Sequence, residues 1–303
     1  MRHLLTLENM PRTEIVRLLD LAEDFRARGQ QRELLSGRTV VNLFFEPSTR
    51  TRTSFEIAAR RLGADVVNFE VPHSSTSKGE SLLDTLHTLE AMRLDALIVR
   101  HGENGMPAYL AASARSEVAV INAGDGSHAH PTQGLLDALT IRRHRDDFEK
   151  LRIVICGDIR HSRVARSDVH ALTALGANRI RLCAPRALLP EDLGEFPDCT
   201  PVEDFDAALQ GADVAVMLRI QKERMAAALL PSDADYFARY GLDARRLALA
   251  SPDCLVLHPG PINRGVEIAP EVADGPQSRI LEQVANGVFV RMAVLAETLT
   301  LPA

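Results

Sequence analysis

Short apolar runs alternate with amphipathic stretches along most of the chain. Runs rich in β-branched residues, such as 39–45 and 96–100, predict buried strands. Apolar residues spaced three or four positions apart, as in 11–28, predict helices that bury one face. By the same two patterns we expect strands at 64–69, 118–122, 151–156, 179–184, 213–217 and 255–258, and helices at 49–62, 81–92, 107–114, 132–144, 164–175, 204–209 and 279–299.

Strands that alternate with helices predict parallel sheets with helices on both faces. The alternation restarts after a charged stretch at 142–150, and 303 residues suffice for two domains of ordinary size. We therefore predict an α/β protein with two doubly wound parallel-sheet domains, residues 1–140 and 141–278, joined by helices. Ligand sites in such sheets form outside the carboxyl ends of the strands, so polar residues that follow a strand are candidates for chemistry.

Composition narrows the classes of function. The net charge of −6 gives no basic surface for nucleic acid, and no apolar run is long enough to span a bilayer. The first residues lack the apolar core of a signal peptide. The cysteines are scattered, mostly in or beside strand-like runs, which favours buried free thiols in a reducing compartment. We therefore expect a cytoplasmic protein with no nucleic-acid or membrane partner.

The stretch 40–63 reads as a strand, a short loop and a helix that begins after Ser48. The first helical turn would hold Arg50 and Arg52, although a helix N-terminus already carries partial positive charge. An anion bound there would resolve the conflict, and the hydroxyls of Ser48, Thr49 and Thr51 would help to hold it. Spacing alone leaves two interpretations level: a phosphate site, or a capped helix with solvated arginines.

Residues 44–56, FFEPSTRTRTSFE, resemble the carbamoyl-phosphate motif of the aspartate/ornithine carbamoyltransferase family. In that family the first domain binds carbamoyl phosphate, the second binds the amino acid, and the active site lies in the cleft between them. The last helix, here about 279–303, packs back on the first domain. The resemblance implies that the substrate phosphate is held by Ser48, Thr49, Arg50 and Thr51.

Polar residues follow two further expected strands of the first domain. The resemblance implies that Arg100 binds the phosphate and the carbonyl oxygen of carbamoyl phosphate. Residues 130–133, HPTQ, match the motif that reads the carbamoyl group, in which His130 polarises the carbonyl oxygen and Gln133 holds the amide. His128, His130 and Asp125 also suggest a metal site, but no further His/Cys cluster supports it.

Residues 70–79 form a polar loop that, on its own, reads as mobile surface. The loop resembles the serine-lysine loop that reaches into the site of a neighbouring subunit in aspartate carbamoyltransferases. Lys78 matches the motif lysine, and either Ser74 or Ser75 matches the serine. The resemblance therefore implies a homotrimer with shared active sites, in which Lys78 contacts both substrates.

The second domain carries two arginines after expected strands. Arg163 and Arg219, with Gln221, match the family's readers of aspartate, and two guanidinium groups suit a dicarboxylate. The stretch before Arg163 lacks Gly-x-Gly-x-x-Gly, which argues against a dinucleotide site. Residues 258–261, HPGP, resemble the aspartate branch, and the resemblance implies that Gly260 and Pro261 present backbone groups to the carbamoyl amide.

Glu46 lies beside the expected phosphate site, where an unpaired acid would be repulsive. In the family this glutamate binds arginines of the second domain when the domains close. Arg163 and Arg224 match those partners. We therefore expect Glu46 to favour the closed form.

The resemblance implies carbamoyl transfer to L-aspartate, an early step of pyrimidine synthesis, without a metal or organic cofactor. Oxyanion stabilisation is expected from Thr51, Arg100 and His130, and stabilisation of the leaving phosphate from Ser48, Thr49, Arg50 and Lys78. The alternatives are carbamoyl transfer to ornithine and a catalytically silent scaffold. The sequence leaves open whether a regulatory chain or a dihydroorotase-like partner binds the trimer.

Overall fold

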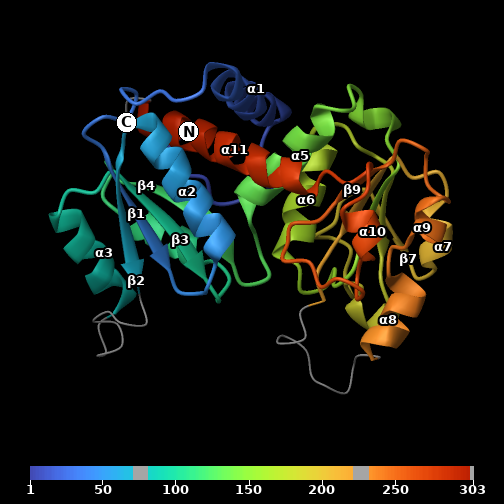
Figure 1. The fold of residues 1–303 in the computed structure, drawn as a ribbon. Helices are drawn as coiled ribbons and strands as arrows, with labels where there is room; N and C mark the ends of the chain where they lie inside the picture. The colour runs from blue at the N-terminus through green and yellow to red at the C-terminus, as the bar shows by residue number, and fades with distance from the viewer. Residues whose placement is uncertain (71–80, 221–231, 301–303) are drawn as a thin grey trace. The chain divides into compact units, whose positions relative to one another are not determined.

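The structure is a computed structural model that describes residues 1–70, 81–220 and 232–300. The chain divides into two compact units. Unit 1 comprises Met1–Leu136 and Ala285–Ala303, and unit 2 comprises Asp137–Val284. Each unit contains a parallel sheet with helices, which confirms the predicted α/β class (Figure 1).

The sheet of unit 1 has the strand order β2-β1-β3-β4 in the described part of the chain, and every pairing is parallel. The order differs from the sequence order, because β1 lies between β2 and β3, and a helix connects each strand to the next along the chain, as parallel pairing requires. The strands are β1 (Thr39–Phe44), β2 (Asp65–Glu70), β3 (Ala96–His101) and β4 (Ala119–Asp125). The helices are α1 (Arg12–Arg28), α2 (Thr49–Leu62), α3 (Leu82–Ala91) and α4 (Met106–Ser113), with most of α11 (Ile280–Thr300).

The two faces of this sheet are buried against different helices. Alternate strand residues such as Val41 and Leu97 join one core cluster with residues of α3 and α4. The helix α2 contacts β1 and β2. In α2, Phe55 is fully buried and lies under the guanidinium of Arg291 from α11, 5.0 Å from the ring centre. The late helix α11 is therefore part of the packing of unit 1.

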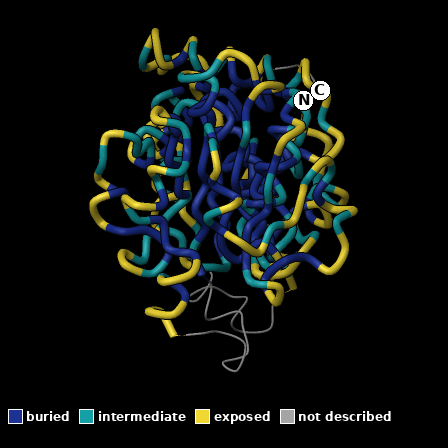
Figure 2. Tube along the Cα trace, turned by 90° about the vertical axis from the view of Figure 1, so that its right-hand side faces the viewer, coloured by how far each residue is buried: buried dark blue, intermediate teal, exposed yellow. Residues whose placement is uncertain are grey.

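The sheet of unit 2 has the order β7-β6-β5-β8-β9 and is also parallel throughout its described pairings. The strands are β5 (Ile153–Cys156), β6 (Ile180–Cys183), β7 (Cys199–Val202), β8 (Val214–Met217) and β9 (Leu255–Leu257). The helices are α5 (Pro131–Arg142), which begins in unit 1, α6 (Arg163–Ala174), α7 (Phe205–Leu209), α8 (Asp233–Tyr240), α9 (Ala244–Leu247) and α10 (Pro270–Ala273). The central strands are almost fully buried, and the exposed residues gather on turns and outer helix faces (Figure 2).

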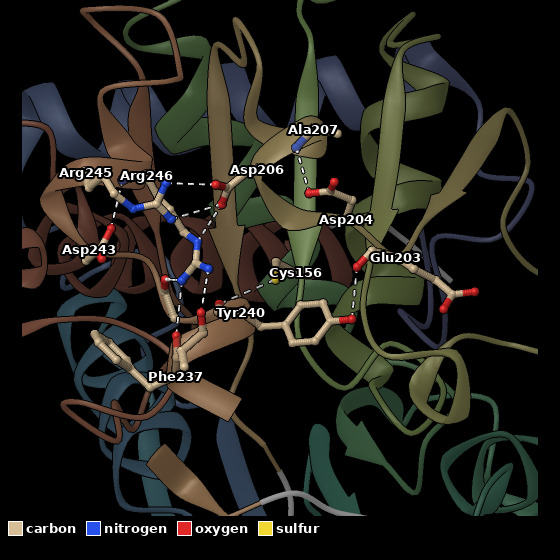
Figure 3. A network of polar contacts seen from close by, with 12 residues as sticks. Cys156, Glu203, Asp204, Asp206, Ala207, Phe237, Tyr240, Asp243, Arg245 and Arg246 are labelled. Atoms are coloured by element: carbon tan, nitrogen blue, oxygen red, sulfur yellow. Dashed lines mark hydrogen bonds and ion pairs between the residues drawn. The ribbon is translucent and has the colours of Figure 1, made fainter. Parts of the chain in front are cut away.

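Unit 2 contains elements that the hydrophobic pattern did not predict, namely β7, α8, α9 and α10. A buried arginine, Arg246, connects the helices α7, α8 and α9 of unit 2. Arg246 of α9 donates to Asp206 of α7 at 2.8 Å and to the carbonyls of Phe237, Ala238 and Gly241 at 2.7–3.1 Å (Figure 3). These polar contacts connect α7, α8 and α9, and α8 also buries Tyr236 and Tyr240.

All of the expected strands and helices are present, with ends that differ by a few residues. The prediction of buried free thiols is confirmed for Cys156, Cys183 and Cys254, whereas Cys199 is only half-buried. Among the described helices, none combines the length and the hydropathy that a bilayer crossing requires.

Candidate active site

The residues expected to bind carbamoyl phosphate lie near or after the carboxyl ends of neighbouring strands of unit 1. Arg100 pairs in register with Phe44, the last residue of β1, and its carbonyl accepts from the Phe45 amide at 2.9 Å. The Arg100 guanidinium donates from Nη1 to the carbonyl of Ala123 in β4, 3.2 Å away. Because β1, β3 and β4 are parallel, the segments after them leave the same edge of the sheet. The structure therefore brings the Ser48 turn, Arg100 and the loop before α5 to one edge.

The N-terminus of α2 has the properties of an anion site. Ser48 is its extended N-cap residue, with φ −157°, and its hydroxyl makes no capping hydrogen bond. The first turn contains no acidic residue that would offset the helix dipole. Thr49 and Arg50 are exposed, whereas Thr51 is buried. A bound phosphate would supply both the missing cap and the missing negative charge.

Glu46 interacts with a cation of its own unit. Its Oε2 lies 3.4 Å from Nε of Arg100, and both side chains are largely buried. This contact explains how an acid is tolerated beside an expected phosphate site. Of the partners expected for Glu46 on closure, Arg163 belongs to unit 2 and Arg224 lies outside the described residues. The pairing of Glu46 with those arginines stays a prediction.

The loop that precedes α5 is built around Asp125, whose side chain is 1% exposed. Its carboxylate accepts from Nδ2 of Asn122 at 2.8 Å, the amide of Gly105 at 2.7 Å and the amide of Ala129 at 3.1 Å, and lies 2.9 Å from Nδ1 of His128. Burial would raise the pKa of Asp125, but the hydrogen bonds from His128, Asn122 and Gly105 lower it below its usual value.

His130 and Gln133 flank the start of α5 and are both buried. The amide of Gln133 donates to the carbonyl of His130 at 2.8 Å, so the two residues belong to one turn. A metal site at this loop finds no support, because no group of three or more His, Cys, Asp and Glu side chains within the described ranges could hold a metal ion. His128 faces Asp125 instead.

The two arginines expected to read aspartate follow neighbouring strands of unit 2. Arg163 begins α6 after β5 and is buried, and Arg219 lies two residues after the end of β8. The ends of these strands are joined by a hydrogen bond from the Leu218 amide to the Cys156 carbonyl, 2.7 Å long. Gly157, with φ +139°, permits this approach, because a Cβ there would lie 2.6 Å from the Leu218 carbonyl oxygen. Both arginines therefore start from the same edge of the sheet.

The turn after β9 is fixed by a buried pair that sequence reasoning missed. His258 and Glu267 have no exposed side-chain surface, and Nε2 of His258 lies 3.0 Å from Oε1 of Glu267. The amide of Gly260 donates to Nδ1 of His258 at 2.8 Å, so Nε2 carries the proton and donates to the carboxylate. The same oxygen accepts from the Asn263 amide at 2.6 Å. Gly260 and Pro261 thus sit in a turn whose ends are tied together.

Some expected site residues lie outside the described ranges. They are Ser74, Ser75 and Lys78 of the first loop, and Gln221 and Arg224 of the second. Their roles stay predictions from the resemblance.

A separate hollow in unit 2 offers a weaker candidate. It has a volume of about 440 Å³ and is lined by residues 203–206, 238–240 and Arg246. The Arg246 guanidinium is committed to oxygens of the protein, as described above, and the other charged groups are of mixed sign. The hollow therefore lacks the convergent charge that the strand-end sites have.

Comparison with known proteins matches two family models to most of the chain. The family model described as the carbamoyl-P binding domain of aspartate/ornithine carbamoyltransferase matches residues 2–143, and the model of the Asp/Orn binding domain matches residues 149–298. The chain belongs to the aspartate/ornithine carbamoyltransferase family. The family's first model spans the Ser48 turn, Arg100 and His130, and its second spans Arg163, Arg219 and the turn after β9.

Relatives within the family favour the aspartate branch. The chain is 58% identical to a protein of Gluconobacter oxydans named aspartate carbamoyltransferase catalytic subunit, over 97% of this chain and 94% of that one. It is equally identical to the protein of that name from Xanthomonas axonopodis pv. citri, over 99% and 96%.

Solved structures of both branches share the fold. Aspartate transcarbamoylase from Trypanosoma cruzi, in complex with carbamoyl phosphate and aspartate, is 34% identical with a TM-score of 0.87 over 98% of this chain and 97% of that one. Ornithine carbamoyltransferase from Pyrococcus furiosus is 27% identical with a TM-score of 0.88 over 100% and 98%. The fold therefore does not separate the branches, whereas the sequence does.

Proposed function

We propose that this protein transfers the carbamoyl group of carbamoyl phosphate to the amine of L-aspartate, which yields N-carbamoyl-L-aspartate and phosphate. The observation that supports this most directly is the 58% identity, over nearly the whole chain, to proteins named aspartate carbamoyltransferase catalytic subunit. The product would enter pyrimidine synthesis at an early step.

In this proposal, unit 1 binds carbamoyl phosphate at the carboxyl edge of its sheet. The phosphate takes the place of a cap at the N-terminus of α2, with Ser48, Thr49 and Arg50 as ligands, and Gln133 holds the carbamoyl amide. Thr51, Arg100 and His130 donate to the carbonyl oxygen as it gains charge. The burial of Thr51 and His130 supports this role, because a donor in a low-dielectric site stabilises an oxyanion more than a solvated donor does.

Unit 2 would bind L-aspartate through Arg163 and Arg219, one guanidinium for each carboxylate, with Gln221 beside them. The neutral amine attacks the carbamoyl carbon, and phosphate leaves without a covalent enzyme intermediate. Gly260 and Pro261 would present backbone carbonyls to the carbamoyl amide. No metal or organic cofactor takes part, and the departing phosphate is our candidate for the acceptor of the amine proton.

The substrate assignment is tested by phosphate release from carbamoyl phosphate with L-aspartate or L-ornithine as the acceptor. We expect turnover with aspartate alone, because two arginines at the amino-acid site would repel the ornithine side chain. Turnover with ornithine would refute the assignment. No turnover with either would favour the silent scaffold, provided that the protein is folded.

A matched pair of variants tests the roles of the two units. We expect His130→Ala to lower kcat by about 100- to 1000-fold, as the loss of one oxyanion donor does elsewhere. Arg219→Ala should instead mainly raise the KM for aspartate, because it removes a group that binds the amino acid in the ground state as well. Equal loss of kcat in both variants would contradict this division.

We also propose a homotrimer in which Lys78 serves the site of a neighbouring subunit. Subunits with Lys78→Ala are mixed with subunits with Arg50→Ala after dissociation. Hybrid sites that regain both groups should restore part of the activity. If hybrids form, as native mass measurement would show, and no activity returns, each site is built from one chain. The same measurement on protein from lysate would reveal a regulatory or dihydroorotase-like partner.

A further inference from the structure

The carboxylate of Asp125 joins separate segments of unit 1 at the edge where the proposed site lies. Oδ1 accepts from Nδ2 of Asn122, within β4, and from the amide of Ala129. Oδ2 accepts from the amide of Gly105, at the start of α4, and contacts His128. A buried carboxylate with this many donors is held in one orientation, because every alternative leaves a buried donor unsatisfied.

These contacts close a tight loop directly before His130. Asp125 binds Ala129 through both its backbone and its side chain, since the Asp125 amide donates to the Ala129 carbonyl at 3.0 Å and Oδ1 of Asp125 accepts from the Ala129 amide at 3.1 Å. The His128 amide donates to the Asp125 carbonyl at 3.0 Å. The residue after Ala129 is His130, so the direction in which the chain enters the His130 turn is set by Asp125.

The same carboxylate connects this loop to the segment that follows Arg100. The Gly105 amide belongs to that segment, and the Gly126 amide donates back to the His101 carbonyl at 2.9 Å. Gly126 has φ +43°, and a Cβ there would collide with the Asn104 side chain, so the two segments are packed without spare room. The loop that bears His130 is thereby tied to the strand that bears Arg100.

We propose that Asp125 is a positioning residue for carbamoyl transfer, which fixes His130 at the carbonyl oxygen of carbamoyl phosphate relative to Arg100. The inference rests on the proposed function. Asp125 touches neither substrate. It acts because a displacement of about 1 Å of a catalytic group can cost about 100-fold in rate.

The test is a double-mutant cycle with Asp125→Ala and His130→Ala. In the wild-type background, Asp125→Ala should lower kcat by about 10- to 100-fold and leave the KM for aspartate within about threefold. In the His130→Ala background, the further loss of kcat should be below about threefold, because the group that Asp125 positions is already absent. If Asp125→Ala lowers kcat by the same factor in both backgrounds, the proposal is overturned.

Binding of inorganic phosphate, measured by calorimetry, separates positioning from general damage. The Kd for phosphate should change by less than about threefold in Asp125→Ala, because the α2 cradle makes none of the contacts described for Asp125. Loss of phosphate binding in parallel with kcat would overturn the proposal. Asp125→Asn, which keeps the side-chain size and one acceptor, should fold if Asp125→Ala does not, and it should show the same pattern at reduced magnitude.

Asp95→Ala is the matched control. Asp95 accepts from the Thr39 amide at 2.8 Å and from Arg38 at 2.6 Å, so it also ties two strands of this sheet, but at their amino ends. Its loss should lower thermal stability and leave kcat unchanged. A wild-type protein that fails to turn over aspartate would refute the proposed function, whereas an active wild type with an equally active Asp125→Ala would refute this inference alone.

Discussion

Two buried carboxyl groups in unit 2, Asp137 of α5 and Asp168 of α6, share an environment that admits one negative charge. Within the described residues, the only hydrogen bond of the Asp168 carboxyl is the one in which it shares a proton with Asp137. Burial, and then the charge and hydrogen bond of Asp137, raise the pKa of Asp168 well above its ordinary value of 3.8. Asp137 in turn accepts from Nε2 of Gln283 at 2.6 Å, and Oε1 of Gln283 accepts from the His258 amide at 2.8 Å. The Gln283 amide therefore has one possible orientation, and Asp168 is the group that holds the proton.

We predict that Asp168→Asn stabilises the protein at neutral and alkaline pH. The native state binds the Asp168 proton more tightly than the unfolded chain does, so native stability is full below the unfolded pKa of 3.8 and falls as the pH rises toward the folded pKa. Asparagine cannot ionise, and its amide can donate to Asp137 at every pH. The substitution thus removes the pH-dependent loss and keeps the hydrogen bond.

The expected gain is about 1–3 kcal/mol at about pH 8, which is the usual cost of a buried polar group without its partner. Near pH 4 the wild-type carboxyl is protonated, and the difference between the two proteins should vanish.

Urea denaturation of wild type and Asp168→Asn between about pH 4 and pH 8 measures the effect. Asp213→Asn is the matched control in the same unit. Burial would raise the pKa of Asp213, but hydrogen bonds from Arg152 and Ser251 lower it, so the same substitution there should destabilise the protein at neutral pH. A loss of stability in Asp168→Asn at about pH 8, or a gain that does not depend on pH, would refute the shared proton.

Further substitutions in unit 2 test other contacts. Gly157→Ala should push the end of β8 away through the Leu218 carbonyl and raise the KM for aspartate by about tenfold or more, with phosphate binding unchanged; unaltered kinetics would contradict the close approach. Glu267→Met should lower the free energy of unfolding by about 1–3 kcal/mol because it leaves the buried Nε2–H of His258 without an acceptor, whereas Glu267→Gln, which keeps that acceptor, should lose less. Hydrogen bonds from Arg245 and Arg246 lower the pKa of Asp206 to about 2. The ionised carboxylate therefore stabilises the native state above its unfolded pKa, and this contribution is lost as the pH falls through about 2. Asp206→Asn should show a shallower acid transition than wild type when unfolding is followed by circular dichroism.

The sequence predicted the elements whose stability comes from apolar burial. Strands such as β1 and β5 are buried and mostly apolar, and α2 carries a buried stripe that ends just before Gly63, whose φ of 90° is left-handed. The strand β7 was not predicted, because it is a short edge strand that contains Pro201 and is largely exposed. The hydrophobic pattern missed α8, although its buried Tyr236 and Tyr240 lie four positions apart, and it missed α9, which has only 4 residues.

The candidate site could be predicted as far as it consists of local motifs. The resemblance named the Ser48 turn, Arg100 and His130. The structure places the Ser48 turn after β1, Arg100 near the end of β3 and His130 after β4 of the same sheet. The supporting contacts could not be predicted, because they join residues that are distant in sequence. The sequence suggested Asp125 only as a possible metal ligand. In the structure its carboxylate accepts a hydrogen bond from the amide of Gly105, 20 residues earlier, and no rule of sequence spacing predicts that contact.

Unit 1 is assembled from two stretches of the chain, because α11 completes a core that begins with α1 and β1. During synthesis the ribosome releases all of unit 2 before it releases residues 285–300. Unit 2 can therefore reach its native packing while Phe55 of unit 1 still lacks its contact with Arg291. A nascent chain stalled before residue 285 should hold a protease-resistant second unit and a first unit that is still readily cleaved.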